Sequence, residues 1–134
     1  MVWEKLQQYE NMAVVKRYAK TFNKDLEFSK EVFNQLLKWF YISRKCCIEK
    51  LPARITSDIN EIDNMWHTFL LFTKDYAAFC EYYFKDFIHH TPLSEDDHID
   101  TEKLKKELKR QLGIINQEFG IETVCSWYKE RKYS

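Results

Sequence analysis

The sequence predicts an all-α protein, and three features support this. The 134 residues include only 2 Gly and 2 Pro, and chains so poor in turn formers are rarely sheets with many hairpins. Apolar residues recur at helical spacing through most of the chain. The 10 Phe, 8 Tyr and 4 Trp can supply the core, because each ring buries a large area. We therefore expect a single compact domain, residues 1–134, of about five to six helices with an aromatic-rich core.

The first helical regions lie before residue 45. Residues 2–22 are predicted to form one long helix or two short ones, with Asn11 as a break between them. The next helix is expected to begin at Ser29, a suitable N-cap, and to continue to about Arg44 on regularly spaced apolar residues. A loop at residues 47–56 should follow, because it contains a proline, which cannot donate a backbone hydrogen bond.

Two more helices are predicted between the prolines. Ser57 or Asp58 can cap a helix that runs to about Phe72. Thr73 is the expected cap of the following helix, which should end near His89. The first of these helices buries Ile59, Ile62, Trp66 and Phe69, and the second buries Tyr76, Phe79, Cys80, Tyr83, Phe84 and Phe87.

The last part of the chain predicts a long helix and a short one. Asp100 or Thr101 can start the long helix. Glycine ends helices readily, so Gly120 should end it. The short helix is expected from about Glu122 to Arg131. The residues expected to face the core are Leu104, Leu108, Leu112, Ile115, Phe119, Val124, Cys125 and Trp127.

Charge and hydropathy argue against several classes of partner. With 21 basic and 21 acidic residues the formal net charge is +0, so nothing overall favours a phosphate backbone or an anionic membrane surface. No run reaches the roughly 18 apolar residues that a membrane span needs. The basic run Lys103–Arg110 alternates with leucines and glutamates, as a solvated helix face does, so nucleic-acid binding is only the least favoured alternative.

The cysteines indicate a reducing compartment. Cys46, Cys47, Cys80 and Cys125 form no C-x-x-C pair, and the vicinal pair has poor geometry for a disulfide. We expect these thiols to act as small buried hydrophobic groups. Together with the charged N-terminal segment, they predict a cytoplasmic protein without a membrane partner.

The residues that can carry chemistry gather in two places. Asp63 and His67 are four apart, so both side chains lie on one helix face, where the carboxylate can orient the imidazole or share a metal ion with it. His89 and His90 follow one helix later. An acidic loop then supplies two further oxygen-ligand candidates, Asp96 and Asp97, whereas His98 is expected to be a solvated loop residue.

Helix length separates the two histidine groups. A helix rises about 1.5 Å per residue, so a fourth helix that continues to His89 carries His90 past the level of His67. The groups meet only if that helix bends or the loop folds back. The strong zinc and di-iron signatures, a phosphate-binding glycine loop and a glycine-flanked nucleophile are all missing. A structural role for the histidines is therefore the alternative to metal binding.

One segment resembles a known family. The residues EIDNMWHTFLLFTKDYAAFCEYYFKDFIHHTP resemble the glycine-rich-domain-containing-protein-like family, whose hallmark runs I/V-D-x-x-W-H-x-H, then a Tyr and often a Cys, then a hydrophobic pair before a His. The match covers about a quarter of the chain and departs from the pattern at Phe69, where the family has a histidine. The glycine-rich region is missing, and the resemblance implies no established activity. The matching residues are Ile62, Asp63, Trp66, His67, Tyr76, Cys80, Phe87, Ile88 and His90.

Three functions stay open at this stage. The first is an interaction or regulatory domain that binds another protein through exposed aromatic side chains, with a polar site formed by Asp63 and His67 together with His89 and His90. The second is a metal-binding domain, with hydrolysis as its candidate activity, that holds a divalent ion through Asp63, His67 and His90. The third is nucleic-acid binding by residues 103–110. No residue is predicted to be catalytic and no organic cofactor is expected. The accessory site candidates are Trp66, Tyr76, Cys80, His89, Asp96 and Asp97.

Overall fold

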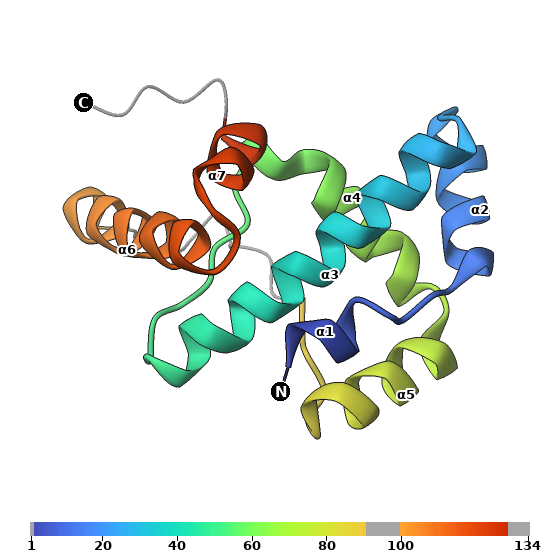
Figure 1. Cartoon of the computed structure of the whole chain (residues 1–134), viewed down its shortest axis with the longest axis horizontal. Helices are drawn as coiled ribbons and strands as arrows, with labels where there is room; N and C mark the ends of the chain where they lie inside the picture. The colour runs from blue at the N-terminus through green and yellow to red at the C-terminus, as the bar shows by residue number, and fades with distance from the viewer. Residues whose placement is uncertain (1, 91–99, 129–134) are drawn as a thin grey trace. The chain divides into compact units, whose positions relative to one another are not determined.

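The computed structural model describes residues 2–90 and 100–128, and within them the chain is helical without a strand. This confirms the all-α class. The described residues form seven α-helices, where about five to six were expected, and one short 3₁₀ turn. Figure 1 labels the α-helices. Their bounds are α1 Trp3–Leu6, α2 Met12–Phe22, α3 Leu26–Ile48, η1 Ser57–Ile59, α4 Asn60–Leu70, α5 Thr73–Phe84, α6 Thr101–Phe119 and α7 Ile121–Trp127.

The chain divides into two compact units. Among the described residues, the first combines the N-terminal part through Tyr41 with Asn60–Ile88, and the second combines Ile42–Ile59 with the part from His89 onward. Helix α3, the longest helix in Figure 1, contributes to both. Within the described residues, no helix is both long enough and apolar enough to cross a membrane.

The N-terminal helices begin where side chains can cap them. Asn11 separates α1 from α2, as predicted, and its side-chain oxygen accepts a hydrogen bond from the backbone of Val14 at 3.3 Å. The predicted cap at Ser29 is wrong, because α3 begins three residues earlier. Asp25 is positioned before that start and accepts a hydrogen bond from the backbone of Phe28 at 2.7 Å. Ser29 is buried inside the helix, where its hydroxyl donates to the Asp25 carbonyl at 2.8 Å.

Aromatic rings from α3, α4 and α5 form the core of the first unit, which confirms the predicted aromatic core. Phe40 and Phe69 are fully buried, and Phe79 is nearly so. The ring centroids of Phe40 and Phe79 lie 5.4 Å apart, and those of Phe69 and Phe79 lie 5.3 Å apart. Tyr76 meets Phe69 edge-on at 5.0 Å. These distances are typical of attractive ring pairs, so α4 and α5 are held firmly together.

Helix α5 ends earlier than the sequence predicted. Its last residue is Phe84, so the expected end near His89 is wrong. Lys85 takes the left-handed conformation with φ 58°, and its N–H bonds the Glu81 carbonyl. Left-handed backbone geometry terminates a helix but is uncommon outside glycine and asparagine. The chain therefore leaves the helix axis five residues sooner, which decides where His90 lies.

Two smaller expectations about these helices also need correction. Helix α4 ends at Leu70 instead of Phe72, and the N-cap of α5 is Phe72, so Thr73 is the first helical residue. The start of α4 agrees better with the prediction. Ser57 and Asp58 lie in the short 3₁₀ turn that leads into the helix.

The second unit is held by α6, α7 and the loop after α3. Asp100 caps α6 as predicted, accepting hydrogen bonds from two backbone N–H groups, and Gly120 ends it with φ 87°. Gln111, which is 1% exposed, fastens the loop. Its amide accepts from the backbone N–H of Arg54 at 2.8 Å and donates to the carbonyl of the same residue at 3.0 Å and to the Tyr128 hydroxyl at 3.3 Å.

The cysteines divide into two kinds, so the expectation that all are buried is only half right. Cys46 and Cys80 are buried, whereas Cys47 and Cys125 are exposed. Burial raises the pKa of Cys46 to about 11 and also raises the pKa of Cys80. Since the thiolate is the reactive form, both buried groups should be unreactive.

We expect two thiols per chain to react rapidly with a disulfide reagent at about pH 8, and four after unfolding. The variant Cys47→Ser, Cys125→Ser should show almost no rapid reaction in the native state. Absorbance of the released thiol measures both quantities. Equal rates for all four native cysteines would contradict the assignment.

Candidate metal centre

Two of the predicted ligands lie together on α4. Asp63 and His67 are one helical turn apart, which brings i and i+4 side chains into contact. Asp63 Oδ1 and His67 Nε2 are 3.3 Å apart, and the side chains are 24% and 58% exposed respectively. The carboxylate is thus partly sheltered beside an imidazole that water can reach.

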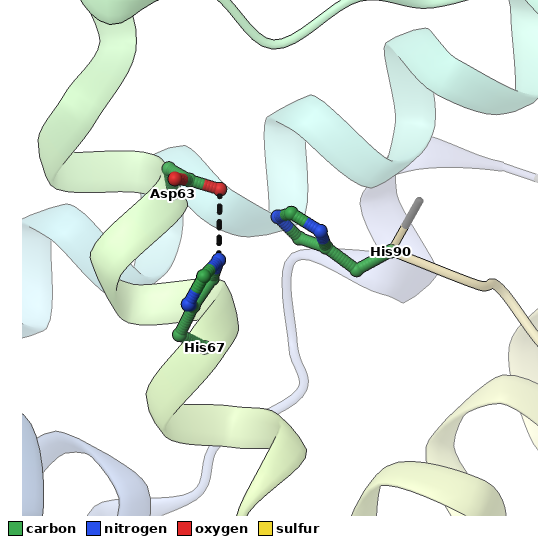
Figure 2. A group of neighbouring side chains, drawn as sticks. All are labelled: Asp63, His67 and His90. Carbon is green, nitrogen blue, oxygen red and sulfur yellow. Dashed lines mark ion pairs between the residues drawn. The ribbon is translucent and has the colours of Figure 1, made fainter. Parts of the chain in front are cut away.

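His90 completes this group. One nitrogen of His90, one nitrogen of His67 and one carboxylate oxygen of Asp63 all lie within 4.8 Å of one another. Figure 2 shows the His90 ring directed toward the ion pair from the chain segment that follows α5, while both other side chains project from the same helix. The structure therefore brings together the three residues that the sequence put forward as metal ligands.

A chain of hydrogen bonds connects α4 to the backbone next to His90. Trp66, the neighbour of His67 in the sequence, donates its Nε1–H to the hydroxyl oxygen of Tyr76 at 3.0 Å. Tyr76 in turn donates its O–H to the carbonyl of Ile88 at 2.5 Å. Two residues span at most about 7 Å. His90 must therefore stay close to the anchored Ile88 carbonyl.

The linking tyrosine is buried and stays protonated. Tyr76 is 1% exposed, and burial raises its pKa well above the ordinary value. Its hydroxyl therefore keeps its proton and donates a hydrogen bond to the Ile88 carbonyl. The Cys80 thiol is buried beside this link, close to the Tyr76 hydroxyl and the Ile88 backbone. Tyr76 and Cys80 therefore lie beside the backbone of Ile88, two residues before His90.

The other candidates have different positions. His89 is exposed and is not part of the group. Asp96, Asp97 and His98 lie outside the described residues. Phe69, which replaces a histidine in the resembled motif, is fully buried among the core rings, so its side chain is not placed as a ligand.

Sequence reasoning missed what positions His90. The Ile88 backbone carbonyl carries no side-chain signal, and a lysine gives no indication of left-handed geometry at residue 85. Only the weak breaker signal of the following Asp86 could have suggested an earlier end for α5.

Comparison with known proteins identifies the family. A sequence model of the UCP032817-like family matches residues 4–123. The chain belongs to the UCP032817-like family. No curated protein and no solved structure matches it. The match has no bearing on the glycine-rich-domain-containing-protein-like family, and the resemblance to that family stays a prediction.

The three candidate ligands lie inside the segment that the UCP032817-like family covers, and they suit a divalent transition metal. Imidazole nitrogens with one carboxylate oxygen bind Zn²⁺, Fe²⁺ or Mn²⁺. Metal bonds of about 2.1 Å place two ligand atoms about 3.4 Å apart in a tetrahedral site. Asp63 and His67 already have this separation. The His90 nitrogen lies within 4.8 Å of the other two ligand atoms, so a shift of about 1.5 Å brings it to this separation.

Proposed function

We propose that this protein binds one divalent transition-metal ion through Asp63, His67 and His90. The observation that carries the proposal is the convergence of one carboxylate and two imidazoles, with ligand atoms within 4.8 Å, from segments separated by a whole helix. Sequence neighbours can meet by helical spacing alone. The approach of a residue 23 positions beyond His67 requires the chain to turn back.

The surroundings support the same function. Metal-binding side chains are normally held by a further layer of hydrogen bonds, and loss of such support weakens binding. Here two hydrogen bonds, from Trp66 to Tyr76 and from Tyr76 to Ile88, connect the neighbour of His67 with the backbone close to His90. The exposed His67 leaves the ion within reach of water. Hydrolysis by a metal-activated water is therefore the activity to assay first.

The test is metal binding by protein purified without a histidine tag. Titration calorimetry with Zn²⁺, Mn²⁺ and Fe²⁺, with elemental analysis of the dialysed protein, should show one ion per chain. His90→Ala should lower the affinity at least about 100-fold, since loss of mere supporting groups already costs 10–100-fold. His89→Ala is the matched control, because that neighbouring histidine is exposed and outside the group.

Two results would contradict the proposal. One is a wild-type protein that takes up no near-stoichiometric ion. The other is equal loss of binding in the His90 and His89 variants. Circular dichroism of each variant shows whether the helices are retained.

A protein-interaction function is the second candidate, and exposed apolar side chains favour it. Tyr82, Leu71 and Phe87 are 72%, 66% and 44% exposed on the first unit. Large exposed rings are common anchors of protein interfaces. We propose a protein partner on this basis, and a cytoplasmic location because all four cysteines are free thiols, as in a reducing compartment. Nucleic-acid binding by the start of α6 keeps the lowest priority, because acidic residues interrupt its lysines.

A further inference from the structure

An open groove runs along α5 on the first unit, which we call the aromatic groove. Its volume is about 580 Å³. All four aromatic rings of its lining and both acidic groups come from the segment between α1 and α2 and from one face of α5. These are Tyr9, Glu10, Asp75, Phe79, Tyr82 and Tyr83. On α5 the spacing of three and four residues explains why these side chains share a face.

The tyrosines of the groove stand at steep angles to one another. The rings of Tyr82 and Tyr83 are 4.8 Å apart with an interplanar angle of 76°, and those of Tyr9 and Tyr83 are 5.8 Å apart at 82°. Tyr82 is 72% exposed. Aromatic faces attract cations through the ring quadrupole, and rings at right angles let one cation meet more than one of them.

The charges of the groove have one sign. The described residues that line it include Glu10 and Asp75 but no lysine, arginine or histidine. Glu10 makes no hydrogen bond or ion pair with the described part of the chain. Asp75 accepts a hydrogen bond from the Asn11 amide at 3.0 Å, which orients the carboxylate without neutralising it. Two uncompensated carboxylates therefore lie beside the tyrosine faces.

We propose that the aromatic groove binds an arginine side chain of a partner protein. A guanidinium ion stacks on aromatic rings and donates hydrogen bonds to carboxylates through its planar fork of N–H groups. The groove offers both kinds of group and is open at the exposed Tyr82. The proposal rests on the interaction function given above and gives it a defined surface. It uses no ligand of the metal centre.

The experiment is an NMR titration of the full chain with a blocked Gly-Gly-Arg-Gly-Gly peptide. Amide shifts should appear at Ala78, Tyr82 and Tyr83, with a Kd on the order of 1 mM. The peptide with glutamine in place of arginine should cause no such shifts. The lysine peptide should bind more weakly, because an ammonium ion cannot stack or bind a carboxylate in two places.

Variants separate the groove from the rest of the surface. Tyr82→Ala and Glu10→Gln should each weaken binding about two- to fivefold, and the double variant more. Leu71→Ala is the matched control, because it removes an exposed apolar side chain that does not line the groove. Tyr82 and Glu10 are both exposed, so both can be changed without disturbing the core.

Three outcomes would overturn the proposal. They are equal shifts with the glutamine peptide, equal affinity for the lysine peptide, and unchanged affinity in the double variant. If the peptide binds to a different surface of this protein, the interaction function is retained but the aromatic groove has no part in it. Metal titrations of the same variants should be unaffected, so failure here is distinct from failure at the metal centre.

Discussion

Replacing Phe69 with alanine is expected to lower the free energy of unfolding by about 3–5 kcal/mol. The Phe69 ring is fully buried at the centre of the first unit. Its removal leaves a cavity that surrounding rings, each fixed by its own neighbours, can fill only in part. The ring partners of Phe69 are Tyr9, Phe33, Phe40, Tyr76 and Phe79.

Denaturant unfolding followed by circular dichroism measures this effect. The matched control is Leu71→Ala, two residues further along the chain, where the side chain is 66% exposed. That change should shift the free energy of unfolding by no more than about 0.5 kcal/mol. Similar values for the two variants would show that the ring of Phe69 is not the centre of the core.

Replacing Tyr76 with phenylalanine is expected to weaken metal binding about 10- to 100-fold without removing any ligand. The change deletes one oxygen atom, which is acceptor for Trp66 and donor to Ile88. The Ile88 carbonyl then has no hydrogen bond from residue 76, so the nearby His90 is held less firmly in place. Loss of buried hydrogen bonds should also lower the free energy of unfolding by about 1–3 kcal/mol.

The metal affinity is measured by calorimetry at a temperature where the variant is fully folded. Tyr82→Phe is the control, since it deletes a hydroxyl of the same helix from an exposed ring. Binding that stays at the wild-type level in Tyr76→Phe would show that the hydroxyl does not position His90. That result would contradict only the positioning role of Tyr76 and not the metal site. Absence of metal binding in the wild type would contradict the metal site itself.

Local patterns predicted most of the helices because local interactions decide them. The break at Asn11, the cap at Asp100 and the stop at Gly120 depend on side chains and backbone freedom within one turn. The error at Ser29 has a local cause as well. Two suitable caps lie four residues apart, and the chain uses Asp25, which lets Ser29 bond back to the preceding turn.

The sequence also predicted the three candidate ligands, but it did not predict that His90 lies close to Asp63 and His67. The spacing of Asp63 and His67 dictates a shared helix face. The position of His90 depends on where α5 stops, and an apolar stripe that continues to Phe87 predicts too long a helix.

The sequence by itself determined the all-α class, the aromatic core and the pairing of Asp63 with His67, because composition and helical periodicity are properties of the sequence alone. Only the tertiary structure decided that His90 joins this pair. A left-handed Lys85 ends α5, and the buried Tyr76 anchors the Ile88 carbonyl. The left-handed turn carries no glycine or asparagine to indicate it, and the link from Tyr76 to Ile88 joins a helix to the segment beyond it, which sequence spacing does not encode.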